Sequence, residues 1–498
     1  MATMDATLAA AGSGADPSSA RRRTWLMLLF AVVILAVSVD AGVEAALGGN
    51  KLLLVVPIGG LAGIGLVALG LVNFENFVLF TVALRASLDI TKPSSGNTGA
   101  AGVSSASSTS GLDPAGALAI VFILMAFFWF MTRHWAGRKS PPASIHRICL
   151  IIFCVAGFLS VIDSADITFS ILTATKVAAV VAMLAVLEVM LISRAAIERM
   201  IAAIYLSAVV PVGYTLVLIA THHSQFTSGG FARFEGTFAQ PNPFAIYLTM
   251  LIVMGVAIFP HLRRRNQILM TALLFGCVIA LYSTFTRSAW LACIVAVVVV
   301  AGLGQRRLLL GGLVAGAIVS LVAVPTIAER FADLGQSSSP NGYATNSLIW
   351  RFNYWDEVLP LAAKDPITGI GLGMSSFETV QAKEPHNDPL RAYVETGIVG
   401  LLAYFLLLIS MGVVARQAMR YTKRRPYSFE RAIAIGFACS AMAFVVLSLV
   451  SNVITQVVVL WYYVAFAAAA YAVTRYRENA RFLGLPPPPD EEPLVVSA

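Results

Sequence analysis

The sequence has 498 residues, of which 58% are hydrophobic and only 12% are charged, and its net charge is +8. Soluble globular proteins contain about twice this proportion of charged residues. The composition therefore excludes a soluble enzyme and a soluble nucleic-acid-binding protein.

Apolar runs of about 15–22 residues recur along the chain, which is the length that a helix needs to cross roughly 30 Å of hydrocarbon. Backbone groups in a membrane must bond to one another, so these runs predict a bundle of helices. The predicted fold class is an all-α polytopic membrane protein with about 12–14 transmembrane helices. The predicted spans are 25–40, 52–72, 77–90, 114–132, 148–163, 171–193, 200–220, 243–259, 268–284, 288–304, 308–325, 393–414, 432–450 and 455–473.

Basic residues gather in alternate connections between these spans, for example at 21–23, 133–139, 263–265 and 416–425. Cytoplasmic loops carry an excess of Lys and Arg, so this alternation predicts about 14 crossings with both termini in the cytoplasm. The sequence does not distinguish whether the short span 77–90 crosses the membrane fully or is a re-entrant segment. The net charge thus reflects topology, and no nucleic-acid partner is expected.

This topology predicts five parts of the chain. They are a disordered cytoplasmic N-terminus (1–24), a first transmembrane part (25–325), a large outer loop domain (326–392), C-terminal transmembrane helices (393–474) and a cytoplasmic tail (475–498). The first transmembrane part also has outer loops at 91–113 and 221–242. The outer domain is expected to be mainly helical, because Leu348, Phe352, Trp355 and Leu359 have helical spacing. This pattern predicts an amphipathic helix along the membrane surface.

Four arginines, Arg233, Arg287, Arg351 and Arg391, are predicted on the outer side, against the usual bias. An arginine near the membrane is costly unless it is paired. Each of them therefore needs a structural ion pair, for example with Glu395, or an anionic ligand. Guanidinium groups bind phosphate oxygens bidentately, and the set of four favours an anion site. A lipid pyrophosphate in the outer leaflet is the natural anion for it.

His386 directly precedes Asn387, Asp388 and Pro389. Asn387 or Asp388 can cap a helix that Pro389 opens, which would fix His386 at a rigid helix end facing the outer surface. A neutral imidazole there can take a proton from a sugar hydroxyl. A capping or packing role is the alternative. No metal site is expected, because no second histidine or carboxylate stands at ligand spacing, and the five cysteines lie in apolar runs.

Two turn-rich segments are also informative. The glycine-rich run 368–373 lacks a preceding strand and a following Lys-Ser/Thr, so it is predicted to be a tight turn between surface helices and not a nucleotide-binding loop. Residues 240–243 predict the turn that starts the next span, with Asn242 as its cap.

Four segments, in this order, resemble the O-antigen ligase and polymerase superfamily. They are RFEGTFAQPNPFAIYL (233–248), FTRSAWLA (285–292), the W-R-x-x-Y-W-x-E to P-I-T-G-I-G-L-G stretch (350–373) and HNDPLRAYVETGIVGLL (386–402). The resemblance covers about residues 230–410.

The resemblance implies a GT-C-like glycosyltransferase of the inner membrane. Such an enzyme transfers a glycan from undecaprenyl pyrophosphate to a glycan or glycolipid acceptor on the periplasmic side, with no metal or other cofactor. By resemblance, Arg233 and Arg287 hold the pyrophosphate and His386 is the base. Glu395 is a helper or structural residue. In-line displacement would invert the sugar carbon. Arg391, Arg351 and Asn387 are candidate supporting residues.

Two other classes of function stay open. A flippase or transporter of lipid-linked glycans would also have many helices, but it predicts ionisable residues deep in the spans and an internal repeat. A structural or sensory membrane protein is the second rival. Within the enzyme class, the sequence does not distinguish a ligase from a polymerase, because both share these motifs.

Overall fold

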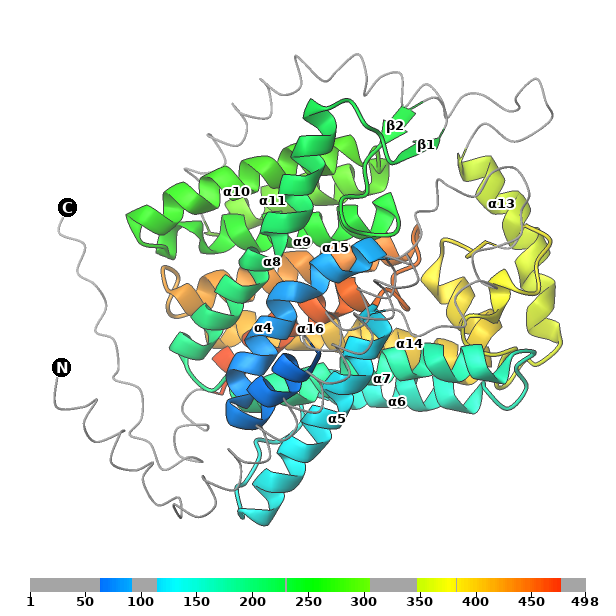
Figure 1. The fold of residues 1–498 in the computed structure, drawn as a ribbon, viewed down its shortest axis with the longest axis horizontal. Helices are drawn as coiled ribbons and strands as arrows, with labels where there is room; N and C mark the ends of the chain where they lie inside the picture. Colours follow the sequence, from blue (N-terminus) through cyan, green and yellow to red (C-terminus); the bar gives the residue numbers. More distant parts are fainter. Residues whose placement is uncertain (1–62, 92–113, 229–230, 305–346, 382, 476–498) are drawn as a thin grey trace, which may run out of the picture. The chain divides into compact units, whose positions relative to one another are not determined.

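The computed structural model describes residues 63–91, 114–228, 231–304, 347–381 and 383–475 (Figure 1). The chain separates into two units, Met1–Val78 and Leu79–Ala498, and all predicted site residues belong to the second. Several predictions lie outside the described residues: the termini 1–24 and 476–498, the spans 25–40 and 308–325, most of the span 52–72, most of the loop 91–113, and the first part of the outer domain up to residue 346.

The described helices follow the predicted apolar runs. They are α4 (Phe74–Leu88), α5 (Pro114–Trp135), α6 (Ile145–Leu159), α7 (Ile167–Met190), α8 (Arg194–Ala220), α9 (Pro241–Ile258), α10 (Arg264–Ser283), α11 (Arg287–Gly304), α14 (Asp388–Tyr421), α15 (Phe429–Ser448) and α16 (Val457–Val473). Short 3-10 turns are η1 (Asp89–Thr91) and η2 (Phe259–His261). The described strands are β1 (Phe226–Ser228) and β2 (Phe231–Arg233), an antiparallel pair.

Seven of the described helices are long and apolar enough to cross a membrane. Four shorter apolar helices accompany them: Gly63–Val72, Ile145–Leu159, Arg287–Leu303 and Val457–Val473. This confirms the prediction of an all-α polytopic membrane protein. The total number of crossings stays a prediction, because two predicted spans lie wholly outside the described residues.

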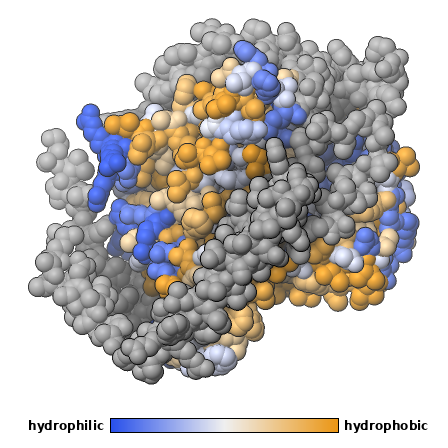
Figure 2. Space-filling model, in the orientation of Figure 1, coloured by the Kyte–Doolittle hydropathy of each residue, from blue (hydrophilic) through white to orange (hydrophobic). Residues whose placement is uncertain are grey.

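Two helices form the centre of the second unit. Nearly every residue of α9 and α16 is buried, and α9 packs against α10, α11 and α15, while α16 packs against α7 and α15. Other helices expose large apolar side chains, such as Phe128 on α5 and Phe275 on α10. Figure 2 shows hydrophobic residues gathered over large areas of the visible face. Apolar surface of this extent suits contact with lipid.

The described part of the segment predicted to lie outside combines helical elements with turns. It contains α13 (Ser347–Val358), η4 (Leu359–Ala363) and η5 (Met374–Ser376). Tyr354 and Val358 pack with Leu361, Ile370 and Val394 in a small core against the start of α14. The expected helix is confirmed, and Phe352 and Leu359 of its predicted apolar face are exposed. Its position along a membrane surface stays a prediction.

Candidate functional site

Arg233 lies at the end of β2 and holds the junction between α10 and α11. Its Nε donates to the carbonyl of Thr284 at 2.7 Å, and its Nη2 donates to Asn242 Oδ1 and to Thr286 Oγ1, both at 3.1 Å. The planar guanidinium thus binds three acceptors at once, as its rigid fork allows. Arg233 is thereby fixed next to Thr286, the residue before Arg287.

Asn242 does not cap α9, so this prediction was wrong. The N-cap of α9 is Gln240, which makes no side-chain cap hydrogen bond. Pro241 opens the helix and has no N–H to satisfy, which reduces the need for a cap. The side chain of Asn242 instead accepts hydrogen bonds from Arg233 and from Thr286 Oγ1.

Arg287 is the first residue of α11 and is half-buried. Phe285, two residues earlier, has a φ of 51°, a left-handed conformation that costs a bulky residue about 1–3 kcal/mol. Trp290 holds this turn: its Nε1 donates to the carbonyl of Leu281 at 2.9 Å, and its ring stacks on Tyr282. The contacts of Trp290 with Leu281 and Tyr282 therefore hold the strained backbone of Phe285 in place.

Arg351 on α13 is close enough to Arg287 for the two positive charges to repel. Burial first, and then the charge of Arg287, lower the pKa of Arg351. Within the described part of the chain, no carboxylate forms an ion pair with Arg351. Two guanidinium groups from distant segments are therefore close enough for their charges to interact, an arrangement that an anion with several oxygens would stabilise.

His386 is half-buried and lies near enough to Arg351 for its ring to sense that charge. Its φ is 52°, so its backbone is also in the left-handed conformation. Its backbone N–H donates to Asn452 Oδ1 at 2.7 Å, and its Nδ1 lies 3.0 Å from Asn452 Nδ2. The ring of Trp350 packs against the imidazole with the centroids 5.7 Å apart. Contacts on two sides thus fix the orientation of the ring.

The surroundings of His386 keep its ring neutral. Burial lowers its pKa to about 4, and the charges of Arg351, Lys383 and Arg391 act in the same direction, while Glu384 acts against them. Lys383 also lies over the ring of Trp350, with Nζ 5.0 Å from the centroid. The site is therefore rich in positive charge around a neutral imidazole.

The two residues after His386 anchor the surrounding backbone. Asn387 caps α14 as predicted, since its side chain accepts from the N–H of Leu390. Asp388 is fully buried, and its carboxylate accepts hydrogen bonds from the N–H groups of Val453 and Ile454. The turn between α15 and α16, which carries Asn452, is thereby fastened to the start of α14.

Arg391 and Glu395, near the start of α14, form a buried ion pair. The Arg391 guanidinium lies between Glu384 at 2.8 Å and Glu395 at 3.0 Å. Glu395 also accepts from the N–H of Gly373 at 2.7 Å and from Ser375 Oγ at 2.6 Å. The carboxylate of Glu395 is thus fully engaged, which fits the structural role among those expected for it.

The glycine-rich run 368–373 is a tight turn, as predicted. Its N–H groups at Ile370 and Gly371 donate to the carbonyls of Val394 and Glu395. The turn lies directly on α14 at Gly397, where φ is 64° and an added Cβ would be 2.1 Å from the carbonyl oxygen of Ile367. Only glycine fits such an approach, so Gly397 sets how closely the turn packs on α14.

The sequence analysis missed Asn452, Lys383 and the anchoring role of Asp388. Asn452 lies far along the chain from His386, and the only local signal is a Ser451-Asn452 pair between two apolar spans. Such a pair also occurs in ordinary turns, so the sequence does not distinguish a residue that orients the histidine.

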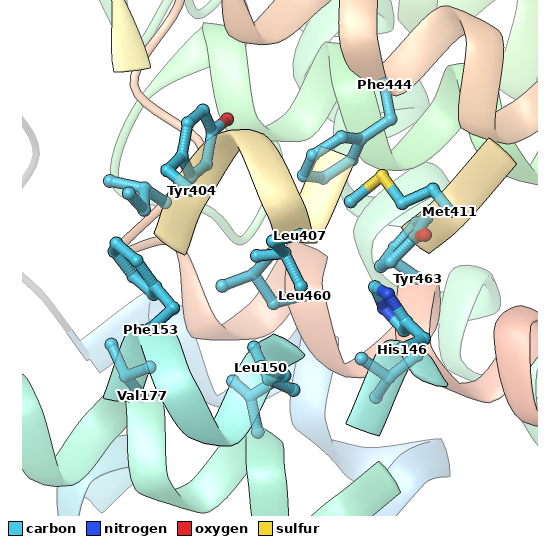
Figure 3. A pocket seen from close by; sticks show the side chains of 13 residues that line it. His146, Leu150, Phe153, Val177, Tyr404, Leu407, Met411, Phe444, Leu460 and Tyr463 are labelled. Carbon is cyan, nitrogen blue, oxygen red and sulfur yellow. The ribbon is translucent and has the colours of Figure 1, made fainter. Parts of the chain in front are cut away.

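A separate cavity lies within the helix bundle, and Figure 3 shows the side chains that line it. They come from α6, α7, α14, α15, α16 and the turn between α15 and α16, are mostly apolar, and include no predicted site residue. His146 lines the cavity, and its Nδ1 pairs with Ser410 Oγ at 2.8 Å. Among the described residues, no group of three or more His, Cys, Asp or Glu could hold a metal ion.

Residues 270–405 match a family model described as O-antigen ligase. The matched range contains Arg287, Arg351, His386, Arg391 and Glu395. No curated protein matches the chain. The matched range is less than half of the chain, and it supports the resemblance of this part to the O-antigen ligase family.

Proposed function

We propose that this protein is a membrane enzyme of the O-antigen ligase and polymerase type, and that it transfers a glycan from undecaprenyl pyrophosphate to an acceptor sugar on the periplasmic side of the inner membrane. One observation supports this most: Arg351 is near enough to Arg287 for the two charges to interact, and the charge of Arg351 also acts on His386, whose lowered pKa keeps the ring neutral. A diphosphate would relieve the repulsion between the two guanidinium groups and would bring the scissile sugar–phosphate bond next to the histidine.

The arginines supply the binding and leaving-group stabilisation that this reaction needs. Negative charge grows on the diphosphate as its bond to the sugar breaks, and fixed cations in a partly dehydrated site stabilise that charge. Arg233 supports Arg287 by holding the strained junction at Thr284 and Thr286. Because guanidinium groups provide the positive charge, the proposed reaction needs neither a metal ion nor a nucleotide.

His386 is the group proposed at the reacting oxygens. The role expected from the sequence is that of a general base on the acceptor hydroxyl, which attacks the anomeric carbon in line and inverts it. The lowered pKa supports a neutral ring at physiological pH. A neutral ring is needed both to accept a proton and to donate a hydrogen bond without a net charge.

The proposal is tested with purified protein in liposomes that contain an undecaprenyl-pyrophosphate-linked glycan and an acceptor glycolipid. Two products are measured: the new glycosidic bond and released undecaprenyl pyrophosphate. We expect equal amounts of both, in the presence of EDTA and without nucleotide. Arg287→Ala should abolish both, whereas the control Arg194→Ala, at an exposed ion pair with Glu198, should not.

Glycan that crosses the bilayer without release of undecaprenyl pyrophosphate would overturn the proposal in favour of a flippase. Use of a lipid-linked repeat unit as the acceptor identifies a polymerase, and use of a core glycolipid identifies a ligase.

A further inference from the structure

We propose that Asn452 holds His386 in the tautomer with its proton on Nε2, so that the ring donates a hydrogen bond to a substrate oxygen instead of acting as a base. This inference rests on the proposed function, since it assigns a role within the same site. Asn452, in the turn between α15 and α16, is then a positioning residue that acts through His386.

The two contacts of Asn452 determine the position of the proton. The backbone N–H of His386 can only donate, so the side-chain oxygen of Asn452 must face it, at 2.7 Å. The amide nitrogen of Asn452 therefore faces the ring, 3.0 Å from Nδ1. An amide NH₂ group can only donate, so Nδ1 must accept and carries no proton. In a neutral imidazole, the proton is then on Nε2.

The amide of Asn452 is not free to turn over. Its neighbours Val453 and Ile454 both donate backbone hydrogen bonds to the buried carboxylate of Asp388, at 2.9 Å and 3.2 Å. Tyr404 donates to the same carboxylate from within α14. Rotation of the amide would also place its NH₂ group against the backbone N–H of His386, two donors facing each other. The tautomer is therefore fixed by three segments of the fold.

The charged groups around the ring disfavour its protonated form. Arg351 faces it from α13, Lys383 and Glu384 from the segment before it, and Arg391 from α14. The net charge of these four groups is positive, and Trp350 covers the ring on another side. Protonation at Nδ1 would also break the contact with Asn452, because both atoms would then be donors.

Nε2 of His386 is the nitrogen that carries the proton and is proposed to bind the substrate. Among the described residues, no side chain or carbonyl accepts a hydrogen bond from Nε2 of His386. The proposed partner is an oxygen of the diphosphate. In the transfer, the acceptor oxygen bonds to the anomeric carbon, the bond from that carbon to the diphosphate oxygen breaks, and its electron pair leaves with the diphosphate. The Nε2–H bond stabilises that oxygen, and the hydroxyl proton passes to water.

The tautomer is measured without substrate, by ¹⁵N NMR of purified protein labelled at histidine, with His386→Gln used to assign the signals. We expect an unprotonated Nδ1 in the wild type at neutral pH. In Asn452→Asp, the carboxylate can only accept, so it should bind Nδ1–H and leave Nε2 unprotonated. A wild-type ring with its proton on Nδ1 would overturn the proposal.

Transfer activity tests the consequence. Glutamine can donate from a position near Nε2 but cannot act as a base, so His386→Gln should retain at least tenfold more turnover than His386→Ala. Asn452→Asp should lose at least tenfold in kcat with the KM for the donor unchanged. Equal inactivity of the glutamine and alanine variants, or full turnover in Asn452→Asp, would overturn the proposal. Absence of transfer in the wild type would instead refute the proposed function, and the NMR result is independent of it.

Discussion

Burial and, after it, the positive charge of Arg287 at the start of α11 lower the pKa of Arg351 on α13. The two residues are far apart in the sequence, and the charge of Arg351 also acts on His386. Like charges are held together at a cost to folding, which a bound anion offsets. This relationship is the basis of the anion site proposed for the enzyme.

Replacement of Arg287 by lysine should reduce transfer nearly as much as replacement by alanine. Lysine keeps the charge but is a point donor, and it cannot bind two phosphate oxygens in one plane. Turnover and KM for the lipid-linked donor are measured in membranes for both variants, with Arg194→Lys as a surface control. Wild-type activity in Arg287→Lys would show that only a generic charge is needed there.

The transfer rate should remain constant as the pH falls from 7 to about 5. His386 acts as a neutral ring, and its pKa is lowered to about 4, so the neutral form persists well below the usual value for histidine. The rate should decline only near pH 4. The sequence alone, with an unperturbed imidazole, predicts a decline below about pH 6. A pH–rate profile of the purified enzyme distinguishes these two expected declines. A decline in rate with its midpoint near pH 6 would contradict the structure.

Glu395→Ala should destabilise the protein strongly. It would remove a fully buried carboxylate that binds Arg391, Gly373 and Ser375. Breaking a buried ion pair by removal of one partner costs about 3–5 kcal/mol. Thermal unfolding in detergent should show a clear fall in Tm, whereas the control Glu198→Ala, in an exposed pair, should change stability by less than about 0.5 kcal/mol. An unchanged Tm in Glu395→Ala would contradict a structural role.

The predicted orientation is tested with single cysteines at two highly exposed positions. Val380, next to the site, is 94% exposed, and Tyr427, between α14 and α15, is 86% exposed. An impermeant maleimide should label Val380→Cys in spheroplasts and should label Tyr427→Cys only after lysis. The five native cysteines are buried and provide a low background. The reverse pattern would place the site in the cytoplasm.

The sequence predicts the helices of this protein better than its site. A long apolar run in a membrane must form a helix, because its backbone groups have no other hydrogen-bond partners and the hydrocarbon thickness sets its length. Accordingly, α9 and α15 begin within a few residues of the predicted spans. The Asn387 cap was also predictable, because a cap and a following proline act locally.

Contacts between distant segments were not predictable in this way. Position and charge alone do not separate the four outer arginines. Only the fold shows that Arg391 is held by two glutamates, whereas Arg351 interacts with the like charge of Arg287. Likewise, nothing local to Asn452 indicates that it orients His386. Such roles depend on which loops the helix packing brings together, and this is encoded over the whole chain.

The most direct test is a cryo-EM map of the protein in nanodiscs with undecaprenyl pyrophosphate bound. The account predicts diphosphate density within hydrogen-bond distance of the guanidinium groups of Arg287 and Arg351 and next to the imidazole of His386. Density for the diphosphate elsewhere, for example in the apolar cavity lined by His146 and Tyr463, would contradict it.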